Sequence, residues 1–153
     1  MKFRLAQLQD LDYLINLLHN DDLGKNRESV NKSSLLSYKK ALENILKDPN
    51  AQLILGIDED ENKDKIIAMA QVNFLTYLTY QGGMRAQIEG VRVDETYRGQ
   101  GLGKQLINHI IEVASNNGCH MVQLTTNKLR PNAIKFYEKI GFESTHEGMK
   151  LNT

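Results

Sequence analysis

The chain has 153 residues, 41% of them hydrophobic and 25% charged, which is typical of one globular domain and argues against a disordered or fibrous protein. Its 19 basic residues balance 19 acidic ones, so no net charge attracts nucleic acid or an anionic membrane, and the single cysteine, Cys119, excludes an intrachain disulfide. Because the sequence has neither a run of roughly 20 apolar residues nor an apolar signal-peptide core after Met1, we expect one cytoplasmic domain over residues 1–153, without nucleic-acid or membrane partners.

The first third of the chain predicts a strand followed by two helices. Residues 2–8 alternate apolar and polar side chains, as a half-buried strand does. Asp10 is a suitable N-cap for a helix whose leucines and isoleucine recur at i, i+3, i+4 and i+7. The polar residues 19–33 predict a loop. A second amphipathic helix then continues to Asp48-Pro49, where the proline disfavours helical backbone.

The middle of the chain predicts three strands. The apolar segment 52–57 is the first, and the charged run 58–65 that follows it predicts a solvated turn. A longer strand is expected over 66–80 and another over 84–93. The glycines of Gln81-Gly82-Gly83 favour a hairpin turn between these two strands.

The last third predicts two more helices and further strands. A glycine-rich loop, 98–103, opens a helix that ends at Asn116-Asn117-Gly118, and a strand follows over 120–126. Pro131 is suited to the first turn of a helix that reaches Lys139, and one or two short strands are expected within 142–151. Because hairpins and crossover helices both occur, the order predicts an α/β fold with a mixed sheet.

The glycine-rich loop fits neither of two familiar phosphate-binding motifs. A P-loop aligned on Gly103-Lys104 would begin at Arg98 and end at Gln105, where glycine and serine or threonine are required. A dinucleotide fingerprint would need glycine at Lys104 or Leu106. The spacing leaves two interpretations open: a nest of backbone N–H groups for a pyrophosphate at a helix N-terminus, or a plain tight turn between strand and helix.

Two blocks of sequence resemble the GCN5-related N-acetyltransferase (GNAT) superfamily. The segment 98–103, Arg-Gly-Gln-Gly-Leu-Gly, matches the family signature Gln/Arg-x-x-Gly-x-Gly/Ala. The segment 132–142, from Asn132 through Phe136-Tyr137 to Gly141-Phe142, resembles the family's second block, one helix and one strand further on. Local similarity in 85–89 and 142–150 points to the bacterial branch that acts on small amines.

This resemblance implies a splayed, mainly antiparallel mixed sheet of six to seven strands flanked by four helices, with acetyl-CoA in the gap after the fourth strand. The backbone of Val91 and Val93 would bind the pantetheine arm, and Asn127 and Asn132 would contact the cofactor. The pyrophosphate would lie on the loop formed by Arg98, Gly99, Gln100, Gly101, Leu102, Gly103 and Lys104.

The resemblance also implies a pair of proton-transfer residues. An amine with a pKa near 10 is mostly protonated at pH 7, which costs an unaided reaction roughly 4 kcal/mol. Glu89 is the expected base, directly or through a water molecule, although it is also suited to pair with Arg85 or Arg92. Tyr137 is the expected acid for the thiolate, although it is also suited to packing beside its neighbour. Residues 89, 91 and 93 share strand parity unless a bulge interrupts the alternation.

The acceptor is expected to be a small primary amine, such as an amino acid or an aminoalkylphosphonate, that attacks directly in a ternary complex. We expect no metal, and the sequence leaves open a homodimer and a role for His146. Two alternatives remain: a protein or peptide N-acetyltransferase, and a non-catalytic acyl-CoA-binding module. The segments expected to shape the acceptor site offer Asp21, Asp22, Arg27, Glu28, Tyr77 and Tyr80.

Overall fold

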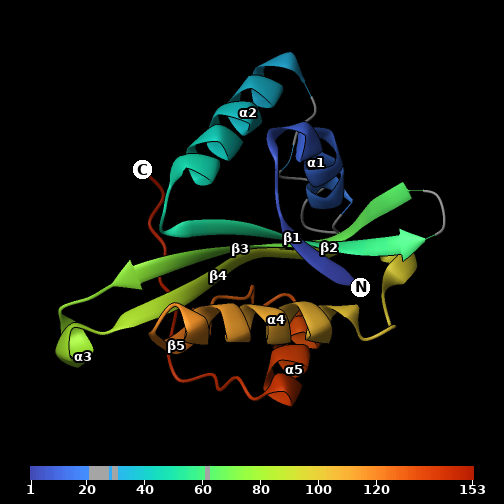
Figure 1. Cartoon of the computed structure of the whole chain (residues 1–153). Helices are drawn as coiled ribbons and strands as arrows, with labels where there is room; N and C mark the ends of the chain where they lie inside the picture. Colours follow the sequence, from blue (N-terminus) through green and yellow to red (C-terminus); the bar gives the residue numbers. More distant parts are fainter. Residues whose placement is uncertain (21–27, 29–30, 61–62) are drawn as a thin grey trace. The chain divides into compact units, whose positions relative to one another are not determined.

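The computed structural model describes residues 1–20, 28, 31–60 and 63–153. Two compact units make up the chain, residues 1–123 and residues 124–153, and each is described by itself. Five strands form one sheet in the order in which they occur along the chain (Figure 1). They are β1 (Lys2–Leu5), β2 (Ala51–Asp60), β3 (Lys63–Thr76), β4 (Met84–Val93) and β5 (Cys119–Leu124).

The sheet is antiparallel from β1 to β4 and parallel between β4 and β5. The first three pairs of neighbouring strands have antiparallel registers. The ring of His120 lies against Gly83, and further along both strands the side chain of Gln123 bonds that of Gln87. Since residue numbers rise in the same direction on both strands, β5 runs parallel to β4, as expected for strands joined by a crossover helix.

Helices cover both faces of this sheet. Helices α1 (Leu11–His19) and α2 (Lys32–Lys47) lie over one face, and α4 (Leu102–Asn116) lies over the other (Figure 1). The side chain of Asn31 caps α2 by accepting a hydrogen bond from the backbone N–H of Ser34 at 2.9 Å. A short helix, α3 (Thr79–Gly82), lies between β3 and β4, and α5 (Pro131–Ile140) belongs to residues 124–153.

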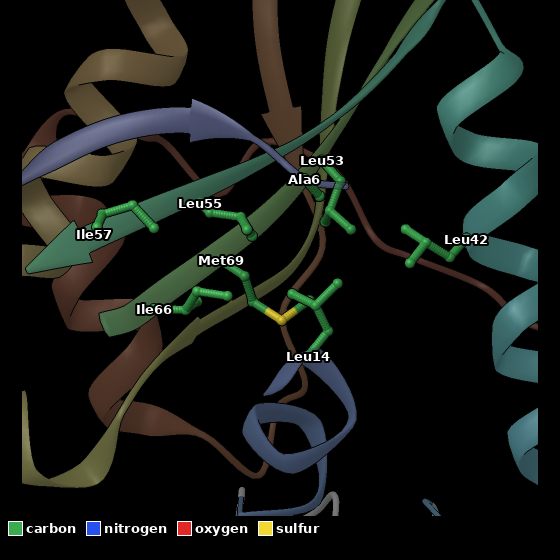
Figure 2. Close-up of a cluster of buried hydrophobic side chains, with 8 residues drawn as sticks. All are labelled: Ala6, Leu14, Leu42, Leu53, Leu55, Ile57, Ile66 and Met69. Carbon is green, nitrogen blue, oxygen red and sulfur yellow. The ribbon is translucent and has the colours of Figure 1, made fainter. Parts of the chain in front are cut away.

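Each face of the sheet buries its own apolar cluster. Toward α1 and α2, the side chains of β2 and β3 meet Leu14 and Leu42 (Figure 2). Toward α4, the buried residues of the sheet include Val72 and Ile88, and the helix buries Ile107 and Ile110. Full burial of a side chain of this size contributes about 1.5–3 kcal/mol, so these two clusters hold the sheet between its helices.

A bulge interrupts β4 at Gly90. Glu89 pairs with Gln71 and Arg92 pairs with Met69, so two residues of β4 stand opposite one residue of β3. Gly90 has φ 62°, a left-handed value that glycine adopts without steric cost and that is typical of the first position of such a bulge. Cross-strand partners point to the same face, so Glu89 and Arg92 share the α1/α2 face.

Several sequence expectations are corrected by the structure. Among the described residues there are five strands rather than six or seven, and five helices rather than four. The final strands expected within 142–151 are absent, because the polar segment 143–148 has no alternating apolar residues to bury. The strand expected to reach Tyr80 ends at Thr76, and α3 replaces its last residues.

The charged run 58–65 is not one solvated turn. Strand β2 continues to Asp60 and β3 begins at Lys63, with Asp58 and Glu59 opposite Lys65 and Asp64. Charged side chains are tolerated there because this end of the hairpin is open to water. The expected single domain over residues 1–153 stays a prediction. No helix in the described part of the chain is long and apolar enough to cross a bilayer.

Candidate active site

The turn before the glycine-rich loop is anchored by Asp94. Its carboxylate accepts hydrogen bonds from the backbone N–H of Thr96 at 2.9 Å and from the hydroxyl of Thr96 at 2.6 Å, and Lys65 lies 3.6 Å away. Burial alone would raise the pKa of Asp94, but the hydrogen bonds of Thr96 and the nearby Lys65 outweigh it and lower this pKa. This fixed turn holds the end of β4 next to the start of α4.

The loop itself enters α4 through two glycines with left-handed backbone. Gly99 and Gly101 both have φ 78°, and Gly101 is the N-cap of α4. A Cβ atom at either position would meet no other heavy atom within 4 Å, so the space beside them is open. The first N–H groups of a helix have no partner within it, and the helix dipole places positive charge there. This backbone geometry is suited to an anion, and binding of a pyrophosphate by the loop stays a prediction.

The polar side chains of the loop turn back toward the preceding backbone. The Nε of Arg98 donates to the carbonyl of Val93 at 3.3 Å, and the amide of Gln100 donates to the carbonyl of Thr96 at 3.4 Å. Lys104 is exposed on the first turn of α4, and Leu102 and Gly103 are half-buried. Backbone N–H groups, rather than the Arg98 Nε or the Gln100 amide, thus remain available to a ligand.

The second half of β4 contains the two valines expected to contact the donor. Val91 and Val93 are half-buried, and each carbonyl oxygen accepts one hydrogen bond from an arginine, Arg92 at 2.8 Å and Arg98 at 3.3 Å. A carbonyl oxygen has two lone pairs and can accept a second hydrogen bond. The contacts between β4 and β5 described above involve Gly83, just before β4, and Gln87, so they lie before Val91 and Val93 along the chain.

Glu89 lies at the end of a chain of side-chain hydrogen bonds. Its Oε1 accepts from Nε2 of Gln87 at 2.9 Å, and Oε1 of Gln87 accepts from Nε2 of Gln123 at 2.8 Å. Oε1 of Gln123 in turn accepts from Nη1 of Arg85 at 3.3 Å. The pairing with Arg85 or Arg92 is wrong, since no arginine of the described chain forms an ion pair with Glu89; two amides stand between Arg85 and the carboxylate.

These amides belong to a polar strip on the α1/α2 face of β3 and β4, which the sequence did not predict. The strip consists of Gln71, Asn73, Arg85, Gln87 and Glu89. On the neighbouring strand, Nε2 of Gln71 donates to Oδ1 of Asn73 at 2.9 Å, and Gln71 pairs with Glu89 across the strands. Both therefore share the α1/α2 face with Glu89. The polar residues at alternate positions of β3 and β4 could have indicated this strip. The same alternation is also typical of any strand with one face in water, so it does not identify a site.

Residues 124–153 contain the other expected site residues. Tyr137 lies on α5 and is half-buried, with its ring edge-on to Phe136 and Phe142 at centroid distances of 5.1 and 5.7 Å. This aromatic packing is the alternative named for Tyr137, and it leaves the role of the hydroxyl as a prediction. Asn132 is exposed in the first turn of α5, where its side chain is accessible to a ligand.

Asn127 begins a turn. Its Oδ1 accepts from the backbone N–H of Leu129 and its carbonyl from that of Arg130, both at 2.9 Å. The side-chain amide N–H groups of Asn127 are not used in this turn. The exposed His146 forms a hydrogen bond of 2.7 Å with the hydroxyl of Thr145. The contact of Asn127 with the cofactor and a role for His146 stay predictions.

The residues proposed for the acceptor side divide into two groups. Asp21, Asp22 and Arg27 lie outside the described residues. Glu28 accepts a hydrogen bond of 2.6 Å from the hydroxyl of Tyr38, while Tyr77 and Tyr80 lie against Arg85.

Cys119 and the metal-ligating residue types do not form a further centre in the described part of the chain. Burial raises the pKa of the Cys119 thiol, which disfavours the nucleophilic thiolate. No three of the described histidine, cysteine, aspartate and glutamate side chains are placed to hold a metal ion.

Comparison with solved structures gives the same fold over the whole chain. A structure described as a transcriptional regulator from Bacillus halodurans C-125 is 45% identical, with a TM-score of 0.92 and 99% of each chain covered. A structure described as a predicted acetyltransferase with acetyl-CoA from Clostridium acetobutylicum has a TM-score of 0.75 at 23% identity, covering 99% of this chain and 95% of its own.

Sequence comparisons identify the family. A glucosamine 6-phosphate N-acetyltransferase from Trypanosoma brucei brucei is 35% identical over 88 residues, which cover 58% of each chain. This chain thus matches less than two thirds of that relative's length. The model of the acetyltransferase (GNAT) family matches residues 15–142, which include the glycine-rich loop, Glu89 and Tyr137. The chain belongs to the GNAT family of acetyltransferases, enzymes that use acetyl-CoA as acyl donor.

Proposed function

We propose that this protein transfers an acetyl group from acetyl-CoA to the primary amine of a small molecule, with Glu89 as the base and Tyr137 as the acid. The observation that supports this most directly is the placement of Glu89. Its carboxylate is exposed on the α1/α2 face of β4, held by Gln87 and directly followed by the bulge at Gly90. A carboxylate that is fixed yet open to solvent is suited to accept a proton from an arriving amine.

The proposed reaction proceeds by direct attack. The acceptor loses a proton to Glu89, directly or through one water molecule, and its nitrogen forms a bond to the thioester carbon. The carbon–sulfur bond then breaks, the thiolate takes the proton of the Tyr137 hydroxyl, and the acetylated nitrogen gives its surplus proton to the resulting phenolate. The products are the N-acetylated amine and CoA with a free thiol.

The donor would be held by backbone groups of the glycine-rich loop and of β4. The N–H groups at the start of α4 are suited to a pyrophosphate because they are unpartnered and lie at the positive end of the helix dipole. Val91 and Val93 would contact the pantetheine arm with the remaining hydrogen-bonding capacity of their backbone. Asn132 and Asn127 are proposed as further contacts to the donor.

A small acceptor is favoured over a peptide by two considerations. The relative from Trypanosoma brucei brucei is named for glucosamine 6-phosphate, a small amine. The polar strip on the α1/α2 face is short, and its described side chains already bond one another, which suits a compact ligand better than an extended peptide. Amino acids, aminoalkylphosphonates and amino sugar phosphates are the acceptor classes to test first.

Release of CoA thiol from acetyl-CoA tests the proposal across a panel of these amines, polyamines and lysine-containing peptides, with acetyl-CoA binding measured in parallel by calorimetry. Turnover of one small class supports the proposed function. Turnover of peptides alone would establish the protein-directed alternative, and acetyl-CoA binding without turnover of any amine would contradict catalysis.

A further inference from the structure

Arg85, on the polar strip of β4, is a cation without an anionic partner among the residues that the structure describes. Its guanidinium carbon lies 4.9 Å from the ring centroid of Tyr77 and 4.7 Å from that of Tyr80. The arginine is half-buried, and no described carboxylate lies within ion-pair distance of it. Two aromatic contacts hold the group in place without neutralising its charge.

Most of the hydrogen-bonding capacity of Arg85 is unused. A guanidinium has five N–H donors, and in the described chain only Nη1 has a partner, Oε1 of Gln123 at 3.3 Å. The Nε atom is buried and has no hydrogen-bond partner among residues 1–20, 28, 31–60 and 63–153. Buried donors are rarely left unsatisfied in folded proteins, and each such group calls for an explanation. A bound anion would supply one.

The tyrosine that covers this arginine is held in an unusual backbone conformation. Tyr80 and its neighbour Gln81 have φ of 54° and 60°, the left-handed region that residues other than glycine rarely adopt. The ring of Tyr80 also stacks on His120 of β5, with centroids 5.4 Å apart. Strain of this kind persists where the surroundings determine it, and it is often found where a ligand is held.

Space for a ligand lies beside these residues. A cavity of about 450 Å³ is lined by residues of the α2–β2 connection and of the end of β3, among them Asp48, Asn50, Leu75 and Tyr77. Leu75 is the cross-strand partner of Arg85. Arg85 does not line this cavity, but two lining residues adjoin Arg85: its strand partner Leu75, and Tyr77, whose ring lies against the guanidinium.

We infer that Arg85 binds the anionic group, a phosphate or a carboxylate, of the amine that Glu89 deprotonates. This inference rests on the proposed function. Arg85 and Glu89 lie four residues apart on the same face of β4, about 13 Å along the strand. The acceptor is thus an amine separated from its anionic group by a spacer of several bonds, and Arg85 determines that specificity.

Matched pairs of amines test this assignment. Glucosamine 6-phosphate is compared with glucosamine, and lysine with 1,5-diaminopentane, so that each pair differs in the anionic group. For whichever anionic amine is turned over, Arg85→Gln raises KM about 10- to 100-fold, as expected for one lost charge-assisted hydrogen bond, with kcat changed less than about twofold. KM for the partner that lacks the anionic group does not rise. The phosphate and carboxylate pairs distinguish the two anions.

Two further variants separate recognition from folding. Arg85→Lys retains the charge but loses the planar donor geometry, so its KM for the anionic amine lies between those of the wild type and Arg85→Gln. Lys2→Gln removes an equal charge from exposed Lys2 on β1, at the far edge of the sheet, and leaves both KM values unchanged. An equal rise in KM for both members of a pair, or no rise for either, would overturn the inference.

A binding measurement distinguishes failure of the inference from failure of the proposed function. Glucosamine 6-phosphate and lysine are titrated calorimetrically into the CoA complexes of the wild type and Arg85→Gln. Binding that requires Arg85 supports the inference even if no amine is turned over. A lack of turnover alone would contradict only the proposed function. Binding equally tight in both proteins, or absent from both, would overturn the inference.

Discussion

The left-handed glycine at the start of α4 allows a test of the donor site with an internal control. Gly101 has φ 78° at the N-terminal end of α4, and Gly118 has φ 76° just beyond its C-terminal end. A Cβ at either position meets no heavy atom within 4 Å. Replacing either glycine by alanine thus imposes the same backbone penalty without a clash, and only Gly101 lies in the proposed pyrophosphate nest.

The expected magnitudes follow from this geometry. A left-handed residue other than glycine costs about 1–2 kcal/mol, so each variant lowers the free energy of unfolding by roughly that amount and Tm by about 2–8 °C. Gly101→Ala also places a methyl group in the open space where the pyrophosphate would approach the N–H groups. Loss of one or two charge-assisted hydrogen bonds would weaken acetyl-CoA binding about 10- to 100-fold.

Calorimetric titration of acetyl-CoA measures both variants alongside the wild type, and thermal unfolding followed by circular dichroism measures their stability. Gly118→Ala is expected to lose stability but to keep the wild-type Kd. Equal Kd values for acetyl-CoA in the two variants would refute the pyrophosphate nest. The backbone penalty that both variants share would then explain any change in binding.

Three further predictions concern the proposed catalytic pair and the N-terminal ion pair. Glu89→Gln is expected to lower kcat about 10²- to 10⁴-fold with an unchanged Kd for acetyl-CoA, measured by thiol release and calorimetry; a wild-type kcat would remove the base. Tyr137→Phe is expected to lower kcat more than it changes the Kd for acetyl-CoA, and unchanged turnover in the same assays would reduce Tyr137 to packing. Arg4 donates hydrogen bonds of 2.7 and 2.8 Å to the carboxylate of Asp10, and these lower the pKa of Asp10 although burial opposes the shift. The ionised carboxylate therefore stabilises the fold at pH values above its unfolded pKa, which is near 4. This stabilisation is lost as the pH falls through the lower pKa of the folded state. Asp10→Asn is therefore expected to lower the urea-unfolding free energy by about 2 kcal/mol at pH 7, with the difference shrinking below pH 4; a constant difference down to pH 2 would contradict this pair.

The backbone parts of the candidate site could be predicted from the sequence because short-range rules determine them. The glycines at 99 and 101 and the first turn of α4 lie where the motif places them, and α4 ends at Asn116, as expected. The N-cap position of Asp10 was also predicted, but its carboxylate bonds Arg4 and the N–H of Gln7 instead of a helix N–H. Local pattern gave the position of this residue, and tertiary contacts determined its partners.

The side-chain parts of the site depend on contacts that no local pattern encodes. The chain from Arg85 to Glu89 passes through Gln123, which is more than 30 residues away in sequence and reaches β4 only through the crossover of α4. The left-handed backbone of Tyr80 contradicts its intrinsic preference, so propensity predicted a continuing strand there. Both features require the assembled sheet.

The bulge at Gly90 is the one irregularity that binary patterning alone specifies. In a regular strand starting from Ile88, which faces α4, every second residue would face α4, and Arg92 would lie in the apolar cluster of that face. One inserted residue at Gly90 instead returns Arg92 to the α1/α2 face, opposite Met69, and places Val93 opposite Ala68. The sequence Ile-Glu-Gly-Val-Arg-Val keeps its charged residues on one face only if the strand bulges at its glycine. The bulge that keeps Arg92 away from the apolar cluster under α4 therefore also sets Glu89 immediately before the segment expected to bind the donor.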